Sequence, residues 1–320
     1  MRERIEAILR LTGYQAGRLR EDSARRSRLK TIAGIVVFLI VVISFVARAK
    51  FTTDQLVANW RPVDLVSTVS SFAIVLACFV WSAFFWYVSV HLLGGRLKLG
   101  RALRIYFLSS LPRYVPGMIW GYVGRAYLCE QEGVARAVAV LSTFAEVCLF
   151  VGTGVCVALF HWLNPEIAIP ITIVTVLLIV AILTPVTLAS TKSRHELKRT
   201  GTIIVSWSLM ALGYLAFWVI YGSSIVLLVQ PIVLVSDLVQ NVRIISGFAL
   251  AWLVGFAAVF VPGGLGIREA GMAFVLEPMV GSLAAVYIAV LSRFLNLAAD
   301  ALLFFVALFR RRATQRAISE

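Results

Sequence analysis

The chain has 320 residues, of which 60% are hydrophobic and 14% are charged, and its mean hydropathy is +0.91. This composition excludes an ordinary soluble globular protein and predicts a polytopic helical membrane protein. The formal net charge is +14, but the basic residues cluster in short segments between apolar runs, as in cytoplasmic loops, which argues against a nucleic-acid-binding surface.

The first thirty residues form a basic segment that holds nine lysine and arginine residues. Apolar side chains lie among the basic ones, so the segment 1–30 is either a short interfacial helix on the cytoplasmic surface or a solvated tail that only fixes orientation. It is too long and too charged for a signal peptide, so residues 31–48 are expected to form an uncleaved first span. The transmembrane domain is expected over 31–310, with a basic cytoplasmic tail over 311–320.

Six apolar segments are long enough to cross the roughly 30 Å hydrocarbon core of a bilayer as helices. They are residues 31–48, 64–93, 134–162, 166–190, 202–229 and 281–309. The basic clusters at 96–104, 192–199 and 310–316 are expected to face the cytoplasm, as are both chain termini. Aromatic residues near the ends of apolar segments are interpreted as interfacial anchors. Examples are Trp60, Trp120, Trp162 and Tyr221.

Two further apolar regions each contain a Pro-Gly pair, and related sequences surround the two pairs. They are 103–130, interrupted at Pro116-Gly117, and 243–280, interrupted at Pro262-Gly263. Pro-Gly breaks a helix, and a membrane tolerates a broken helix only where protein or water covers the freed backbone groups. Two matched breaks in the two halves of a membrane protein indicate a transport site.

The positions of the basic loops decide how the two broken regions meet the membrane. If 103–123 crossed fully, the basic loop at 192–199 would face outside, against the positive-inside rule. If 103–130 is instead a hairpin that enters and leaves on the cytoplasmic side, every basic cluster lies inside. The span 202–229 then ends outside, and the last span must end inside at the basic cluster 310–316, so the hairpin 243–280 lies on the outer side. We therefore expect an all-α polytopic membrane protein with about six full spans plus two re-entrant broken-helix hairpins related as an inverted repeat. The segment 243–261 is also long enough to reach nearly across the bilayer.

Charged residues inside apolar segments are costly, so each is a candidate functional residue. The first repeat contains Arg113, Arg125 and Glu146, and the second contains Arg268, Glu269, Arg293 and Asp300. In the last span, Arg293, Asn296 and Asp300 are spaced so that they share one helix face.

These residues suggest a pocket near the bilayer midplane for an anion such as phosphate. Each helix that restarts after a break would point free amides and the positive end of its dipole inward, where the arginines would add charge. The glycines would let a headgroup approach the backbone, and the acidic residues would hold the arginines or take up protons. The predicted substrate-binding residues are Arg113, Pro116, Gly117, Arg125, Glu146, Pro262, Gly263, Gly264, Gly266, Arg268, Glu269, Arg293, Asn296 and Asp300.

A purely structural interpretation stays open for any single one of these residues. Arg268 and Glu269 could cap a re-entrant tip with their own charges, and a helix–helix ion pair could join Arg293 to Asp300. The duplication of the broken helices favours a functional role for the set as a whole, because packing alone does not explain it.

Other chemistries have little support in the sequence. The three histidines fall at span ends or in loops, and there is no HExxH, GxSxG or Walker-type motif. The cysteines have no CxxC spacing and are interpreted as small core residues. They are Cys78, Cys129, Cys148 and Cys156. We therefore expect no metal, no cofactor and no enzymatic activity.

The residues around the two breaks resemble the two signatures of the lysylphosphatidylglycerol synthase transmembrane-region family. Arg113–Gly117, followed by Arg125 and the helix that carries Glu146, is similar to the first signature. Pro262–Glu269, followed by Arg293, is similar to the second and more distinctive one. The resemblance covers roughly residues 30–310.

In that family the domain is associated with flipping aminoacylated phosphatidylglycerol, or occurs alone beside lipid-linked sugar pathways. The resemblance therefore implies a lipid translocase in the cytoplasmic membrane of a prokaryote. It does not imply aminoacyl transfer, which in two-part members belongs to a soluble domain that uses aminoacyl-tRNA, and the chain ends at Glu320 without such a domain.

Three hypotheses follow. The first is a flippase for an anionic phospholipid or a polyprenyl-phosphate-linked lipid, with the headgroup bound between the two hairpins. The second is a non-transporting scaffold for a lipid-modifying or glycosyltransferase enzyme, and the third is an intramembrane enzyme that uses Glu146, Glu269 or Asp300 as acid–base groups. The expected partners are membrane lipids with anionic or phosphate headgroups and not nucleic acid, while an enzyme partner and oligomers stay open.

Overall fold

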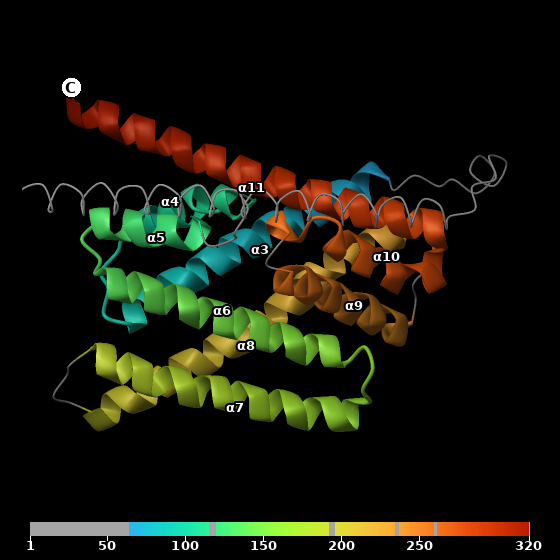
Figure 1. Ribbon diagram of the computed structural model, residues 1–320, viewed down its shortest axis with the longest axis horizontal. Helices are drawn as coiled ribbons and strands as arrows, with labels where there is room; N and C mark the ends of the chain where they lie inside the picture. The colour runs from blue at the N-terminus through green and yellow to red at the C-terminus, as the bar shows by residue number, and fades with distance from the viewer. Residues whose placement is uncertain (1–63, 115–119, 192–195, 234–236, 259–260, 320) are drawn as a thin grey trace, which may run out of the picture.

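The computed structural model describes residues 64–114, 120–191, 196–233, 237–258 and 261–319 (Figure 1). In these ranges the chain forms α-helices and two short 3-10 turns, η1 and η2, with no strand. In chain order they are α3 (Leu65–Leu92), α4 (Leu99–Leu108), η1 (Leu111–Tyr114), α5 (Trp120–Gln131), α6 (Arg136–Leu159), α7 (Pro165–Ser190), α8 (Glu196–Val229), α9 (Leu238–Ala257), η2 (Pro262–Gly264), α10 (Ile267–Val280) and α11 (Ser282–Ser319). The predicted all-α class is confirmed for the described residues, while the basic segment 1–30 and the predicted first span 31–48 lie outside them.

Among the described residues, six helices are long and apolar enough to cross a membrane, so the chain is a multi-pass membrane protein. They are α3, α6, α7, α9, residues 200–229 of α8 and residues 282–309 of α11. Five of them match predicted spans. The sixth, α9, lies in the second broken region, so its 20 residues make the first arm of that region long enough to reach across, whereas α10 has only 14.

Polar residues at the loop ends fix where two of these helices begin. The carboxylate of Asp64 accepts a hydrogen bond from the backbone N–H of Ser67 at 2.8 Å, and that of Asp237 accepts one from Val239 at 3.1 Å. Each carboxylate satisfies one of the donors that the first helical turn leaves free. Both helices therefore begin at a defined residue.

The central helix is α8, which contacts α3, α6, α7 and α9. Its buried face carries large aromatic side chains that form much of the core. They are Trp207, Tyr214, Phe217, Trp218 and Tyr221. Tyr221 is only 2% exposed, so its interpretation as an interfacial anchor is wrong, whereas Trp120 and Trp162 are exposed at the surface.

Glycines let these aromatic side chains pack closely against neighbouring helices. A Cβ atom at Gly213 would lie 2.3 Å from the ring of Phe85, and one at Gly154 would lie 2.7 Å from the ring of Trp218. Small residues at helix contacts are typical of membrane proteins, in which helices associate through close packing.

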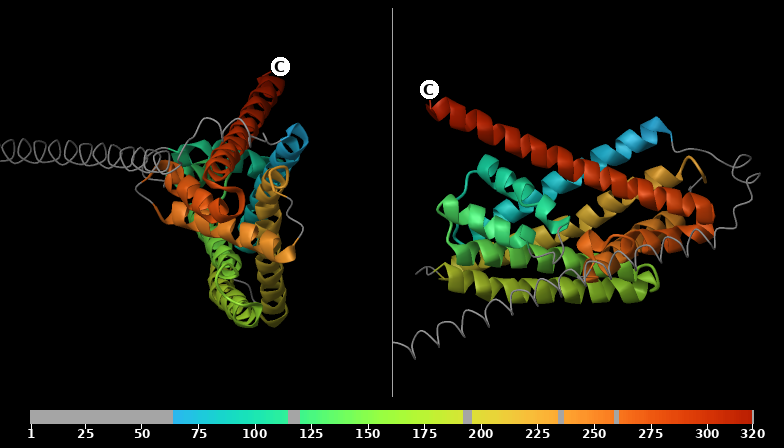
Figure 2. Two further views of the ribbon diagram at one scale, coloured as in Figure 1. Left: turned by 90° about the vertical axis from the view of Figure 1, so that its right-hand side faces the viewer. Right: turned by 45° about the horizontal axis from the view of Figure 1, so that its top comes forward.

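The two broken regions lie toward opposite ends of the bundle (Figures 1 and 2). Helices α4 and α5 lie at the end where α6 begins, and α10 lies at the end where α6 finishes. The turn η1, which comes just before the first break, nevertheless contacts η2 at the second break. Residues far apart in the sequence are thereby brought to the same place inside the bundle.

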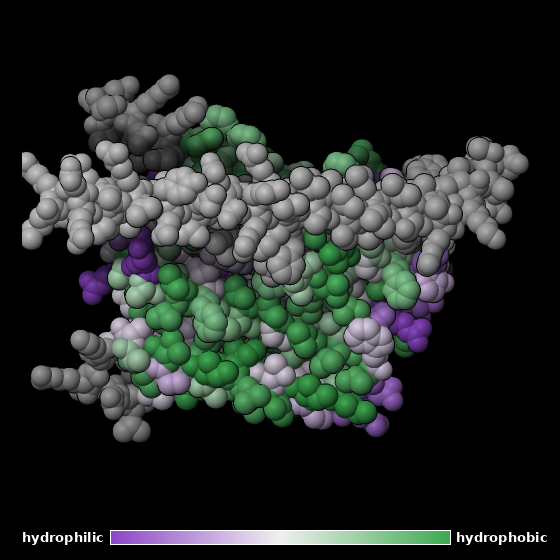
Figure 3. Space-filling view, viewed as in Figure 1, coloured by the Kyte–Doolittle hydropathy of each residue, from purple (hydrophilic) through white to green (hydrophobic). Residues whose placement is uncertain are grey.

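The outer surface is suited to lipid. Figure 3 shows hydrophobic residues over most of the face formed by α6 and α7, with hydrophilic residues gathered toward the two ends. Within the described part of the chain, helix α7 packs mainly against α6 and α8, and it exposes large aliphatic side chains such as Ile173 and Leu177. A belt of this kind is expected where helices face acyl chains.

Candidate functional site

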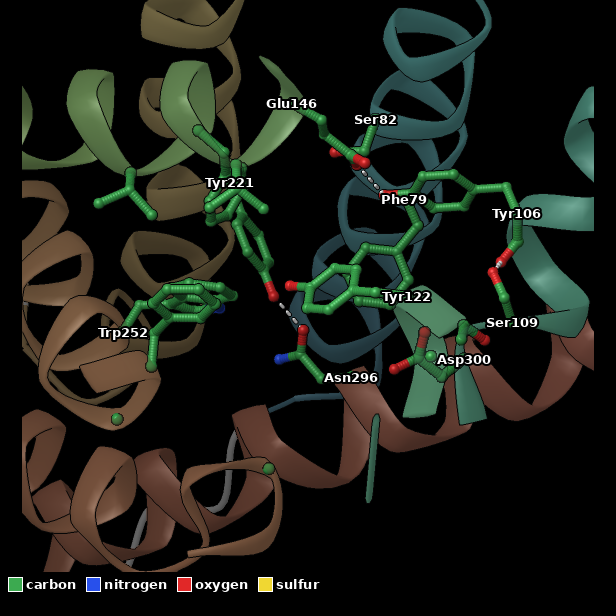
Figure 4. Close-up of a pocket in the computed structure, with 18 of the residues that line it drawn as sticks. Phe79, Ser82, Tyr106, Ser109, Tyr122, Glu146, Tyr221, Trp252, Asn296 and Asp300 are labelled. Atoms are coloured by element: carbon green, nitrogen blue, oxygen red, sulfur yellow. Dashed lines mark hydrogen bonds between the residues drawn. The ribbon is translucent and has the colours of Figure 1, made fainter. Parts of the chain in front are cut away.

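A cavity of about 160 Å³ lies among α3, α4, α5, α6, α8, α9, α10 and α11, beside the second break (Figure 4). Its lining combines charged side chains with an aromatic wall. The charged and amide residues are Arg125, Glu146, Arg268, Arg293, Asn296 and Asp300. The aromatic residues are Phe79, Tyr106, Phe107, Tyr122, Phe150, Phe217, Tyr221, Trp252 and Phe256. Such a lining can accept a group that is partly polar and partly apolar.

On one side of the cavity, Arg125 of α5 forms an ion pair with Glu146 of α6. The two side chains are 7% and 10% exposed. The hydroxyl of Tyr106 donates to the second carboxylate oxygen at 2.6 Å, and Arg125 Nε donates to Ser109 Oγ at 3.3 Å. The guanidinium carbon also lies over the rings of Tyr106 and Trp86, at 4.1 and 5.1 Å from their centroids. The charge of Arg125 is thus neutralised by a carboxylate, and its guanidinium is held in place by a hydrogen bond and by two aromatic rings.

On the other side, Glu269 of α10 connects the second break to α11. One carboxylate oxygen accepts the backbone N–H of Gly266 at 2.5 Å and so caps the start of α10. The other lies 3.4 Å from Nε of Arg293, a partner that the sequence did not indicate for this arginine. Arg293 also donates to the carbonyl of Gly263 at 2.9 Å. The start of α10 is therefore capped by the chain's own carboxylate, where the sequence suggested free amides.

The two ion pairs have the same layout with the charges exchanged. In the first, the broken region supplies the arginine (Arg125) and the following span supplies the carboxylate (Glu146). In the second, the broken region supplies the carboxylate (Glu269) and the following span supplies the arginine (Arg293). Each pair fastens a broken region to the helix that comes after it.

Arg268, the second residue of α10, lies in a different environment. Its guanidinium carbon lies 5.5 Å from the ring centroid of Phe248 and 5.8 Å from that of Trp252, both on α9. Its Nη2 donates a long hydrogen bond of 3.4 Å to the hydroxyl of Tyr221. A Cβ atom at Gly255 would lie 2.8 Å from Cβ of Arg268, so α10 can approach α9 only because that residue is glycine.

The predicted polar face of the last span is confirmed. Arg293, Asn296 and Asp300 are all buried and all line the cavity from α11. The hydroxyl of Tyr221 donates to Oδ1 of Asn296 across the cavity (Figure 4). This contact joins α8 to α11 and places Tyr221 in the site, although the sequence suggested a position at the membrane surface.

The glycines of the second break serve the fold more than the cavity. Gly263, Gly264 and Gly266 have φ values of 58°, 65° and 83°, which other residues rarely adopt. A Cβ atom at Gly264 would lie 2.6 Å from the carbonyl oxygen of Gly255. Of the three, Gly263 lines the cavity. At Gly264 the missing side chain makes room for another backbone segment, and the approach of a headgroup to these glycines stays a prediction.

The remaining predicted site residues fall at the first break and at the start of the second. Pro116 and Gly117 lie outside the described residues. The backbone of Arg113 lies in η1 and that of Pro262 in η2, and their side chains are outside the description. Because η1 and η2 contact each other, both positions belong to the region where these two turns meet.

The aromatic wall is the part of the site that the sequence did not reveal. One signal was available, because Phe248, Trp252 and Phe256 recur every four residues and therefore share a face of α9. Tyr106 and Tyr122 follow no such pattern. Their places depend on how the first broken region packs, which the sequence does not show.

The cysteines behave as core residues. Cys78, Cys129 and Cys156 are buried and Cys148 is partly buried. In the ranges that the structure describes, no three histidine, cysteine or acidic residues come together as a metal site would require.

Comparison with known proteins gives one match. A family model described as "Lysylphosphatidylglycerol synthase TM region" matches residues 31–303, which is most of the chain. No curated protein and no solved structure matches.

Proposed function

Since the chain belongs to the lysylphosphatidylglycerol synthase TM region family, we propose that it is a translocase for a membrane lipid. The transported lipid is an anionic phospholipid or a polyprenyl-phosphate-linked lipid. Its headgroup passes through the cavity between the two broken regions while its chains stay in the bilayer. The protein performs no chemistry on the lipid.

The observation that carries this proposal is the mixed lining of the cavity. Three arginines reach the cavity from α5, α10 and α11, inside a domain whose outer surface is apolar. Charges at such positions are costly and mark substrate pathways in membrane proteins. The aromatic wall beside them suits the part of a lipid next to its headgroup.

We further propose that the two broken regions are re-entrant hairpins that enter from opposite faces as an inverted repeat. The positions of α4 and α5 at one end of the bundle and α10 at the other, with η1 and η2 in contact, support this arrangement (Figure 1). A site enclosed by two opposed hairpins can be opened to either side by small movements of one hairpin at a time. The distribution of the basic loops supports a topology with the α4–α5 hairpin and both termini on the cytoplasmic side of the cell membrane.

The roles of Glu146 and Glu269 favour translocation over lipid chemistry. Glu146 and Glu269 are both engaged with arginines, and Glu269 also caps a helix. A carboxylate fixed in this way is poorly placed to act as a general acid or base, which must exchange protons with a substrate. We therefore assign both to holding the site together.

Transport in proteoliposomes tests the proposal. The purified chain is reconstituted with a trace of phosphatidylglycerol or polyprenyl phosphate that carries a fluorescent label on its chain, and the label in each leaflet is followed over time. We expect the label to change leaflets faster than in protein-free liposomes. If neither lipid moves faster than in the protein-free liposomes, the translocase proposal is wrong and a scaffold role becomes the better account.

A further inference from the structure

The three arginines that line the described part of the cavity differ in how their charge is balanced. Arg125 pairs with Glu146, and Arg293 pairs with Glu269. Within the described ranges, no carboxylate oxygen lies within 4.0 Å of the Arg268 guanidinium nitrogens. The neighbouring carboxylate of Glu269 cannot serve Arg268 in this arrangement, because its two oxygens face Gly266 and Arg293.

The surroundings of Arg268 hold its charge in place without neutralising it. Phe248 and Trp252 offer ring faces that attract a cation, and the hydroxyl of Tyr221 accepts one of its N–H groups. All three are uncharged partners. A guanidinium inside a membrane domain is stabilised further when an anion reaches it, and Arg268 faces the cavity through which such an anion can come.

We propose, building on the translocase function, that Arg268 is the residue that binds the phosphate group of the transported lipid. Arg125 and Arg293 are positioning residues that hold the two broken regions to α6 and α11. The planar fork of an arginine matches two phosphate oxygens, which a lysine does not reproduce. The site therefore recognises the phosphodiester, the group common to many anionic lipids, through Arg268.

The aromatic wall indicates that this phosphodiester arrives on a lipid and not as a free ion. Trp252 and Tyr221 lie beside Arg268 and also line the cavity, so the same space offers an apolar surface next to the cation. Burial of apolar area adds to affinity in proportion to that area. A lipid should consequently bind more tightly than its headgroup alone.

Binding to the purified full-length protein in dodecyl maltoside tests the assignment by calorimetric titration. The probes are dihexanoyl phosphatidylglycerol, its chain-free counterpart glycerophosphoglycerol, and inorganic phosphate. We expect the lipid to bind most tightly of the three. Arg268→Gln should weaken its binding about tenfold or more, because a hydrogen-bonded charge is lost, and Arg268→Lys should fall between the two.

Two further sets of variants serve as controls. Arg243→Gln removes an exposed arginine of α9 that does not line the cavity, and it should leave the affinity unchanged. Arg125→Gln and Arg293→Gln should lower the melting temperature, whereas Arg268→Gln should change it little. If Arg268→Gln binds the lipid with wild-type affinity, the assignment is wrong. If Arg268→Gln does not fold, the Arg268→Lys variant decides. Wild-type affinity of Arg268→Lys for the lipid would show that Arg268 does not bind two phosphate oxygens at once, and the assignment would be wrong.

The outcome is separable from that of the translocase proposal. If the wild-type protein transports lipid and a folded Arg268→Gln variant transports it equally fast, the assignment fails and the function stands. If the wild-type protein transports nothing but binds the lipid through Arg268, the function fails and the binding site stands.

Discussion

Two buried arginines, Arg125 and Arg293, are balanced by carboxylates that come from other helices. Arg125 and Glu146 are 21 residues apart, and Glu269 and Arg293 are 24 residues apart. In both cases the pair joins two helices that are consecutive in the chain. The pairs therefore act on the positions of helices as well as on local charge.

The pair of Arg125 and Glu146 gives a direct test of this role. Glu146→Gln leaves Arg125 buried without its carboxylate, which should destabilise the protein by about 3–5 kcal/mol. The double variant Arg125→Gln/Glu146→Gln should recover part of that loss, because no uncompensated charge remains. Melting temperatures of the purified variants in one detergent measure both effects.

An exposed ion pair nearby provides the control. Glu130 pairs with Arg136 at 3.3 Å, and both side chains are more than half exposed. Glu130→Gln should therefore change stability by about 0–1 kcal/mol. Equal losses for Glu130→Gln and Glu146→Gln would contradict a special role for the buried pair.

At the scale of single residues, the sequence located the charges but not their partners. Charged residues stand out in apolar segments, so Arg125, Glu146, Arg268 and Arg293 were found from the sequence. Which carboxylate faces which arginine depends on how the helices turn toward one another. Tyr221 was misassigned because a tyrosine near the end of a span looks the same whether it faces lipid or the interior.

At the scale of helices, the second break depends on two glycines that touch across helix ends. Gly264 has a φ of 65°, and the hydrogen that replaces its side chain faces the backbone of Gly255. The sequence PGGLG thus allows the chain to turn and to start α10 directly after these five residues. Its conformation fixes where Arg268 and Glu269 lie.

A substitution at this turn should disturb the site. Gly264→Ala requires both an unfavourable φ and a Cβ atom 2.6 Å from the Gly255 carbonyl oxygen, so we expect a large fall in melting temperature and a loss of lipid binding. Gly133→Ala is the matched control, since Gly133 has a φ of 80° but no atom within 4 Å of the added Cβ. It should cost only about 1–2 kcal/mol, the penalty of the conformation itself. A Gly264→Ala variant no less stable than Gly133→Ala would show that the contact with Gly255 is unimportant.

Helix positions were predictable where length and hydropathy decide them. The spans α3, α6, α7, α8 and α11 follow from long apolar runs. The Pro-Gly pairs indicated the breaks, and the length of 243–261 indicated that the first arm of the second region could reach nearly across, but nothing indicated that α4 would begin before the expected hairpin. Helix α4 packs against α11, which is distant in the sequence, and such contacts are not visible in the sequence.

At the scale of the whole molecule, the two hairpins make a prediction about topology. If each is re-entrant, its two ends lie on the same side of the membrane. Single cysteines, in a chain whose four native cysteines are replaced, can be placed at exposed residues on both ends: Lys98 and Gln131 for the first hairpin, Asp237 and Gly281 for the second.

A membrane-impermeant thiol reagent applied to intact cells and to inverted vesicles measures the accessibility of these positions. We expect Lys98 and Gln131 to react from the cytoplasmic side, and Asp237 and Gly281 from the opposite side. Reaction of Lys98 and Gln131 from different sides would mean that the first region crosses the membrane fully.

The central claim is that lipid headgroups pass through the cavity between the hairpins, and filling that cavity tests it most directly. Gly121 of α5 lines the cavity, whereas an added Cβ atom at Gly124 of the same helix would meet no atom within 4 Å and Gly124 does not line it. Leaflet exchange of labelled phosphatidylglycerol is measured in proteoliposomes for the wild type, Gly121→Trp and Gly124→Trp, with the melting temperature of each as a check on folding. The account predicts that Gly121→Trp stops transport while Gly124→Trp retains it. Transport at the wild-type rate in a folded Gly121→Trp protein would contradict the account.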